Sequence, residues 1–397
     1  MAPIRVALIG LSSSSPSWLS LAHLSYLLSA RGQQKFQIVA LQNSSLSAAE
    51  AAIKKYNFDP TVVKAYGSPE DLAKDEDVDL VVSGTRVDVH YGTLKGVLEG
   101  WKTTGKTAGK GVYSEWPLAS NLQQVEELVA LAKETGIKTV VGTQGWASPV
   151  VKKIGEVLKS GRVGKVLSSE LWLSGVTAER EAMQEKTEYF TKRETGGNMW
   201  SIGGGHLIDL LQNALGELTN VKSHFHTQRP LVPLKDSATG TITRTVTSNT
   251  PDLLYVVGSL PASDTVQQNA SLHLRMRRGP PFPGEPAFVW TLTGEKGEIR
   301  VTSKESVAII LGAGEVEIEI HDYETDKVEE VEWKWEEWQE ELPAPARNVG
   351  SVYEGVWEAW AEGLSTSEEG GEKRYNDWEV AGRRHELLER LLVDNGF

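Results

Sequence analysis

A serine-rich turn near the start of the chain contains the first residues that could hold a ligand. It reads Gly10-Leu11-Ser12-Ser13-Ser14-Ser15-Pro16-Ser17-Trp18. Dinucleotide-binding folds carry Gly-x-Gly-x-x-Gly at such a turn, and here Ser12 and Ser15 stand at the second and third glycine positions. Serine is small, and its hydroxyl group can bind phosphate beside the amides at the start of the next helix. The turn predicts a pyrophosphate site formed by Gly10, Leu11, Ser12, Ser13, Ser15 and Trp18, although such a turn can also simply cap a helix.

A second polar segment, Gln42-Asn43-Ser44-Ser45, follows the second predicted strand. An acidic residue at this point usually binds the ribose of NAD. Gln42 and Asn43 are neutral and do not repel a 2′-phosphate. We therefore place both residues in a cofactor site that accepts NAD or NADP.

The elements that must position these residues alternate between strands and helices through the first half of the chain. Apolar runs predict strands over 4–9, 36–41, 78–83, 112–114 and 139–142, and amphipathic patterns predict helices over 18–28, 48–56, 91–99 and 122–135. Largely apolar strands between amphipathic helices indicate a parallel sheet covered on both faces. The expected fold is a doubly wound α/β Rossmann domain over residues 1–145.

The pattern changes after Lys165 to longer strands with alternating polarity. These are expected over 166–173, 254–260, 270–276, 288–292 and 298–302, with a helix over 203–215 and terminal helices over 352–360 and 378–392. They predict an α+β domain over 146–397 with a large, open, mostly antiparallel sheet, whose terminal helices can pack back on the first domain. The run Val331–Glu336, followed by Trp338, is expected to be an edge strand with one aromatic face, suited to an interface.

Length and composition set the class of protein. At 397 residues two domains are expected, and 40% apolar with 24% charged residues is ordinary for a globular chain. The net charge of -13 argues against direct binding of nucleic acid or anionic membranes. The absence of cysteine excludes thiolate metal sites and cysteine nucleophiles, and we expect no metal site. No signal peptide or bilayer-length apolar run is evident, so we expect a cytoplasmic protein, or a nuclear one if it is a regulator.

Several short motifs together resemble the Gfo/Idh/MocA family of glucose-fructose oxidoreductases and inositol dehydrogenases. They are Gly10, Val78–Thr85 with His90, Ser114-Glu115-Trp116-Pro117, Gln144–Pro149, Ser160–Val166, Gly196-Gly197 with His206–Asp209, and Gly294–Glu298. Within that family the chain is most similar to the fungal branch of galactose-pathway co-repressors. The resemblance implies a Rossmann domain and an α+β domain whose open sheet makes a homodimer. It also implies NAD or NADP held by Thr85, His90 and Glu115, although a structural role at the start of a helix suits His90 equally well.

The sequence departs from the family where catalysis usually lies. The family's catalytic lysine is Trp116 here, and its aspartate, four residues before the histidine, is Ile202. His206 remains, and a neutral imidazole can act as acid or base near pH 7. The resemblance therefore implies His206 as the proton-handling residue, whereas the residues alone favour a buried histidine satisfied by the backbone.

Aromatic residues within the motifs predict a dry substrate pocket. We expect its walls to include Trp116, Trp146, Trp200, Tyr113 and Asp209, although ordinary core packing is the alternative. Indole walls suit a flat or apolar ligand. The first functional prediction is an NAD(P)-dependent oxidoreductase acting on an aromatic or apolar hydroxyl or carbonyl compound. The alternatives are a dinucleotide-binding co-repressor-like regulator with a protein partner and no catalysis, and a cyclase or isomerase without redox chemistry.

Overall fold

The computed structural model describes residues 2–175, 179–363 and 374–397. They form two compact units. The first contains residues up to Gln144 together with Glu336–Glu386, and the second contains Gly145–Trp335 with Leu387–Phe397. The terminal segment 336–386 thus returns to the unit that contains the first strand.

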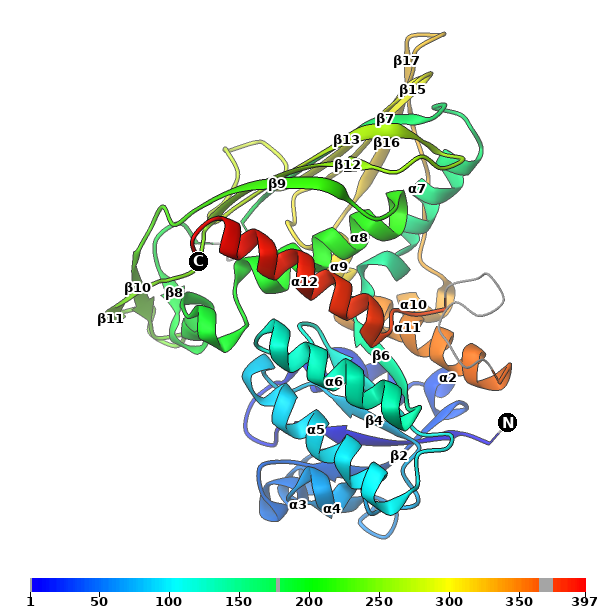
Figure 1. Cartoon of the computed structure of the whole chain (residues 1–397), viewed down its shortest axis with the longest axis vertical. Helices are drawn as coiled ribbons and strands as arrows, with labels where there is room; N and C mark the ends of the chain where they lie inside the picture. Colours follow the sequence, from blue (N-terminus) through cyan, green and yellow to red (C-terminus); the bar gives the residue numbers. More distant parts are fainter. Residues whose placement is uncertain (1, 176–178, 364–373) are drawn as a thin grey trace. The chain divides into compact units, whose positions relative to one another are not determined.

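Six parallel strands form the sheet of the first unit, in the order β3-β2-β1-β4-β5-β6 (Figure 1). The strands are β1 (Ile4–Ile9), β2 (Phe36–Gln42), β3 (Lys64–Tyr66), β4 (Leu80–Ser83), β5 (Gly111–Glu115) and β6 (Lys138–Gly142). The helices between them are η1 (Leu19–His23), α1 (Leu24–Leu27), α2 (Ala30–Gln33), α3 (Leu46–Lys55), α4 (Pro69–Leu72), α5 (Val87–Thr104) and α6 (Leu122–Thr135). Every residue of β4 is buried, as expected for a strand covered on both faces. The order confirms the predicted doubly wound Rossmann sheet.

The terminal segment packs on the first helices of this unit. It comprises α10 (Glu337–Glu340), α11 (Ala344–Ala361) and the start of α12 (Trp378–Asp394). Tyr353 of α11 stacks on Tyr26 of α1 with ring centroids 5.3 Å apart, and Glu354 accepts hydrogen bonds from Tyr26 and Arg31. Residues far apart in sequence therefore share one aromatic core.

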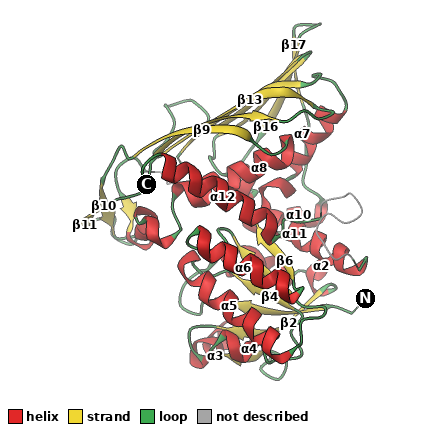
Figure 2. Cartoon of the chain, viewed as in Figure 1, coloured by secondary structure: helices red, strands yellow, loops and turns green. Residues whose placement is uncertain are grey.

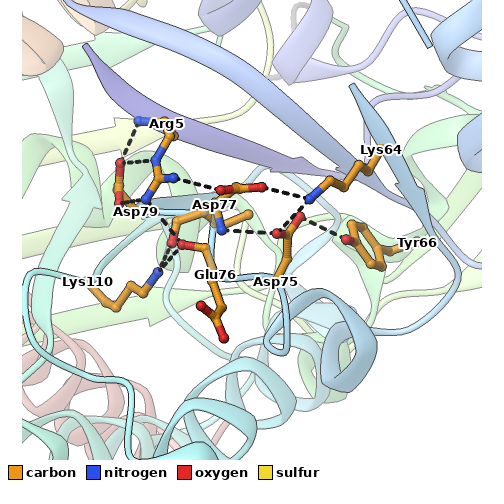
Figure 3. A network of polar contacts seen from close by, with 9 residues as sticks. Arg5, Lys64, Tyr66, Asp75, Glu76, Asp77, Asp79 and Lys110 are labelled. Carbon is orange, nitrogen blue, oxygen red and sulfur yellow. Dashed lines mark hydrogen bonds and ion pairs between the residues drawn. The ribbon is translucent and has the colours of Figure 1, made fainter. Parts of the chain in front are cut away.

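A polar network lies near the start of β1 and β4 (Figure 3). The Arg5 guanidinium donates two 2.9 Å hydrogen bonds to Asp79, and Lys64 pairs with Asp75 at 3.0 Å and with Asp77 at 2.9 Å. The buried Lys110 ammonium, just before β5, donates to backbone carbonyls in the same loop, and burial lowers its pKa. Protein groups thus neutralise one another at this edge, and the opposite, carboxyl edge of the sheet is where ligands bind in such folds.

An eight-stranded sheet, mostly antiparallel, dominates the second unit, in the order β17-β16-β15-β14-β7-β13-β12-β9. Its strands are β7 (Val166–Ser174), β9 (Thr219–His226), β12 (Leu253–Leu260), β13 (Val266–Arg277), β14 (Phe288–Gly294), β15 (Gly297–Ser303), β16 (Glu317–Asp322) and β17 (Lys327–Glu330). Helices α7 (Pro149–Lys159) and α8 (Gly205–Leu215) lie on one face (Figure 2). This sheet confirms the predicted α+β architecture.

The smaller elements of the second unit surround these layers. They are a three-stranded sheet of β11 (Ile242–Thr247), β10 (Leu231–Lys235) and β8 (Met183–Gln184), helix α9 (Ala308–Leu311), and the short helical segments η2 (Gln144–Ala147), η3 (Glu185–Thr191), η4 (Arg193–Thr195) and η5 (Met199–Gly204). None of the helices described by the structure is both long and apolar enough to cross a membrane.

One strand prediction was wrong. Residues 331–336 form no regular strand, because β17 ends at Glu330. The Trp333 indole instead donates to the carbonyl of Val316, and its ring packs edge-on against Trp335. The alternating aromatic residues are therefore partly buried against their own unit instead of forming an edge strand.

Candidate functional site

The first turn of the Rossmann unit places the backbone of Gly10 close to the Thr85 side chain. Gly10 follows β1 with φ +95°, a conformation that favours glycine. A Cβ atom on Gly10 would lie 2.5 Å from Cγ2 of Thr85, which follows β4. The turn thus requires glycine at this point, as the dinucleotide fingerprint predicts for its first position.

The serines after Gly10 make a turn of their own before the helix starts. The Ser12 hydroxyl accepts hydrogen bonds from the amides of Ser14 and Ser15, each at 3.2 Å. Ser17 and Ser20 cap the helix reciprocally, since each hydroxyl accepts from the other's amide. Adjacent backbone amides of this kind can also bind a phosphate oxygen. Rotation of one side chain would free these two amides, while Ser13, Ser14 and Ser15 stay wholly or partly exposed.

The end of β2 presents oxygen acceptors. The Asn43 amide nitrogen donates to the carbonyls of Leu11 and Ala48, which leaves its Oδ1 for another partner. Gln42 is buried, and its Oε1 has no hydrogen-bond partner. Two acceptors at the end of the second strand suit the hydroxyl groups of a ribose.

Buried polar atoms without partners gather at the carboxyl ends of the strands. Besides the Gln42 oxygen, they are Nε1 of Trp18, the Ser83 hydroxyl and the Thr85 hydroxyl. Such atoms are costly in a core unless a ligand or water binds them. With the glycine turn, they show that the residues of this edge fit a dinucleotide.

Both ring nitrogens of His90 lie within hydrogen-bond distance of backbone carbonyls near this edge. The ring is fully buried in the first turn of α5, with Nδ1 2.9 Å from the Pro117 carbonyl and Nε2 2.9 Å from the Thr85 carbonyl. Burial lowers its pKa. The histidine therefore links the loops that follow β4 and β5, and we assign it a positioning role.

The Glu115 side chain is buried in the core of the first unit. Its Oε1 lies 2.8 Å from Nε2 of His23, whose Nδ1 lies 2.9 Å from the Tyr353 hydroxyl. One neutral histidine tautomer satisfies both contacts, with Nε2–H donating to Glu115 and Nδ1 accepting from Tyr353. The Oε1 atom of Glu115 is thus held by His23 inside the first unit, and the backbone of Glu115 at the end of β5 is what we assign to a cofactor.

Two aromatic residues predicted for the pocket belong largely to the core of the first unit. Tyr113 is fully buried, its ring packs on His23 and Tyr353, and burial raises its pKa. Trp116 is 5% exposed, and its ring centroid lies 4.5 Å from that of His385 on α12. The indole therefore fills the family's lysine position with a packed, non-titrating group.

In the second unit, η5 is a π-helix that leads into α8, and His206 stands in the first turn of α8. His206 is partly exposed, like Ile202 one turn earlier, but its Nδ1 is enclosed and has no hydrogen-bond partner. Burial lowers the pKa of His206 to about 4, so the ring is neutral at pH 7. A π-turn beside an unsatisfied imidazole is typical of functional sites.

The remaining pocket predictions have mixed outcomes. Trp200 is fully buried, and its indole donates to the Leu388 carbonyl, so it is a core residue and not a pocket wall. Asp209 is also buried, whereas Trp146 is partly exposed. The described residues contain no group of three or more histidine, aspartate or glutamate side chains that could hold a metal ion.

Sequence reasoning missed His23, Tyr353 and His385. The first sits in a helix whose pattern indicates only packing, and the other two come from the terminal segment. No local motif marks them. The sole signal was their residue type within otherwise apolar helices.

Comparison with known proteins agrees with this geometry. Residues 4–143 match the oxidoreductase family with an NAD-binding Rossmann fold, and residues 149–303 match the C-terminal domain of Gal80p. The chain is 31% identical to dehydrogenase aclE of Aspergillus oryzae over 75% of this chain and 76% of that protein. It is 29% identical to the galactose/lactose metabolism regulatory protein GAL80 of Kluyveromyces lactis, over 65% of this chain and 55% of that one. The crystal structure of a super-repressor mutant of Gal80p from Saccharomyces cerevisiae shares the fold, with a TM-score of 0.85, 20% identity, and coverage of 100% of this chain and 96% of that one.

Proposed function

Because the chain belongs to the Gfo/Idh/MocA oxidoreductase family, with a Gal80p-type C-terminal domain, we propose that it is an NAD(P)-dependent oxidoreductase. The observation that carries the proposal is the Gly10 turn, where Thr85 leaves no room for a Cβ atom, beside unpartnered polar atoms at the ends of β2 and β4. A structural turn alone does not need these buried atoms to remain unsatisfied. A dinucleotide supplies the missing partners.

The residues would divide the binding between them. Gly10 with Ser12, Ser13 and Ser15 would hold the pyrophosphate, Gln42 and Asn43 the ribose, and Thr85 the nicotinamide side. Bound nicotinamide supplies or accepts a hydride. His206 would bind the substrate hydroxyl or carbonyl oxygen and exchange its proton, as a neutral imidazole at pH 7.

The substrate we propose is an aromatic or apolar hydroxyl or carbonyl compound. Trp116 and Ile202 replace the charged groups that relatives use at these positions, so fewer polar partners are offered to a free sugar. Trp146 adds a partly exposed indole. Apolar walls with one imidazole favour a flat ligand with a single polar handle.

One observation favours a second candidate function. Neither Trp116 nor Ile202 can transfer a proton, and a relative at 29% identity is a regulatory protein. A regulator would keep the dinucleotide site without turnover and bind a protein partner. We also propose a homodimer formed through the large sheet of the second unit.

Calorimetric titration with NAD and NADP, together with turnover on aromatic ketones and alcohols, tests the proposal. Gly10→Ala should abolish dinucleotide binding, because its Cβ would meet Thr85. Gly109→Ala is the matched control, since Gly109 also has positive φ but open space around it. Binding with turnover supports the oxidoreductase, binding without turnover supports the regulator, and absence of binding contradicts both.

A further inference from the structure

The most accessible part of the serine-rich turn 10–18 is the pair Ser15-Pro16. Ser14, Ser15 and Pro16 are all exposed. The Ser15 amide donates to the Ser12 hydroxyl, but none of the hydrogen bonds among the described residues uses the Ser15 hydroxyl. This hydroxyl group is therefore open to a modifying enzyme.

Pro16 distinguishes Ser15 from the serines before it. Proline fixes its own φ, lacks an amide donor and disfavours helical backbone at the preceding residue. Proline-directed serine kinases select a serine by the proline that follows it, and they need its hydroxyl group exposed. Ser13 and Ser14 are not followed by proline. Ser15 thus meets both requirements of such a kinase.

Three further Ser-Pro or Thr-Pro pairs occur in the chain, and each has different surroundings. Ser148 and Thr250 are 1% and 5% exposed, so a kinase cannot reach their hydroxyl groups. Ser68 is partly buried at the start of α4, where its hydroxyl accepts from the Asp71 amide and donates to the Asp71 carboxylate. Of the four pairs, only Ser15-Pro16 has both residues exposed.

The same turn is the proposed site of the cofactor pyrophosphate. The amides of Ser14 and Ser15 donate to the Ser12 hydroxyl, and residues 10–18 include no charged side chain. A phosphate group on Ser15 would add a charge of about -1.5 to -2 and three strong acceptor oxygens. These oxygens would compete for the amides that the pyrophosphate needs, and their charge would repel it.

We propose that Ser15 is the phosphorylation site of a proline-directed serine kinase, and that the modification switches off dinucleotide binding. The Ser15 Oγ attacks the γ-phosphorus of ATP and forms the new O–P bond. The bond from this phosphorus to the bridging oxygen of ADP breaks, and the hydroxyl proton passes to the catalytic aspartate of the kinase. The inference rests on the proposed cofactor site and adds its regulation.

Incubation of the whole folded chain with ATP and a proline-directed serine kinase, followed by mass spectrometry of its peptides, tests the modification. We expect phosphate on Ser15 and none on Ser68, Ser148 or Thr250. Pro16→Ala keeps Ser15 but removes the feature that the kinase selects, so this variant should lose the phosphate and still bind dinucleotide. Absence of phosphate on Ser15 in the parent protein, or equal incorporation into Pro16→Ala, overturns the assignment.

Calorimetry with NAD and NADP tests the effect on binding. The phosphorylated protein should bind dinucleotide on the order of 100-fold more weakly than the parent protein, because two multiply charged groups then share one turn. Ser15→Glu adds a single charge and should weaken binding about tenfold. Thr103→Glu, exposed near the end of α5, is the matched control for added charge and should bind like the parent protein.

The outcomes separate the two proposals. A phosphorylated protein that binds dinucleotide as tightly as the parent protein overturns the switch and leaves the cofactor site standing. A parent protein that binds neither dinucleotide overturns the cofactor site and the switch together. Circular dichroism of the phosphorylated protein and of Ser15→Glu verifies that the fold is intact, and equal weakening in Thr103→Glu would contradict an effect specific to this turn.

Discussion

The Nε2 atom of His23 lies 2.8 Å from Oε1 of Glu115, and this pair joins the end of η1 to the end of β5 inside the Rossmann unit. His23 is fully buried, and Glu115 is 8% exposed. The carboxyl group fits there because residue 142 is glycine: a Cβ atom on Gly142 would lie 2.5 Å from the same carboxyl oxygen. The end of β5, beside the proposed cofactor site, is therefore held by a polar relay in the core.

We predict that His23→Ala lowers the free energy of unfolding by about 3 kcal/mol, because it leaves a buried carboxyl group without its donor. Urea denaturation of the whole chain measures the change. Tyr353→Phe removes only the outer hydroxyl of the relay and should cost about 1 kcal/mol. If the two variants lost equal free energy of unfolding, the unpaired buried carboxyl group would not be the main cause of the destabilisation in His23→Ala.

Stability should decrease as the pH falls below about 6.5, the ordinary pKa of histidine. Burial lowers the pKa of His385 to about 3 and of His206 to about 4, so the unfolded chain binds protons that the folded chain does not. The stabilisation is complete above pH 6.5 and is lost as the pH falls toward these values. At pH 5 each of these two histidines should lower the free energy of unfolding by about 2 kcal/mol relative to neutral pH.

His385→Gln isolates one of these contributions. His385 Nε2 accepts a 3.1 Å hydrogen bond from the Leu118 amide, which glutamine can still accept without titrating. When denaturation is measured at pH 6.5 and at pH 5, the free energy of unfolding should fall less between these two pH values in this variant than in the parent protein. An unchanged difference between the two pH values would mean that His385 does not titrate on unfolding in this range.

Ser44 should control the choice between NAD and NADP. It is exposed directly after Asn43, where the ribose 2′-position is expected. Ser44→Asp should weaken NADP binding about tenfold relative to NAD, and Ser44→Arg should shift the ratio the other way by a similar factor. Calorimetry with both dinucleotides measures the ratio, and Ser44→Ala serves as the uncharged control. If Ser44→Asp and Ser44→Arg changed the ratio of NADP to NAD binding equally, the ribose would not lie beside Ser44.

The sequence is most informative where structure depends on neighbours along the chain. Gly10, Gln42 and Thr85 could be predicted as one site because strand–turn–helix periodicity is local and parallel strands bring their carboxyl ends to one edge. The relay of Glu115 could not, since His23 and Tyr353 are 330 positions apart. Likewise Trp200 resembled a pocket residue by its motif, but only packing against Phe225 and Leu388 reveals that it is core.

The last prediction separates the two residues that stand at the family's catalytic positions. Trp116 is packed on His385 and its indole cannot accept a proton, so Trp116→Phe, which keeps an aromatic ring, should preserve turnover of any accepted substrate. His206→Ala should reduce kcat by about two to four orders of magnitude, because it removes the proposed proton-handling group. His206→Asn, which keeps a hydrogen bond but cannot exchange a proton, should be nearly as slow while retaining KM. A His206→Ala protein as active as its parent would show that another group handles the proton, and a strong loss in Trp116→Phe alone would assign the indole a direct role in substrate binding.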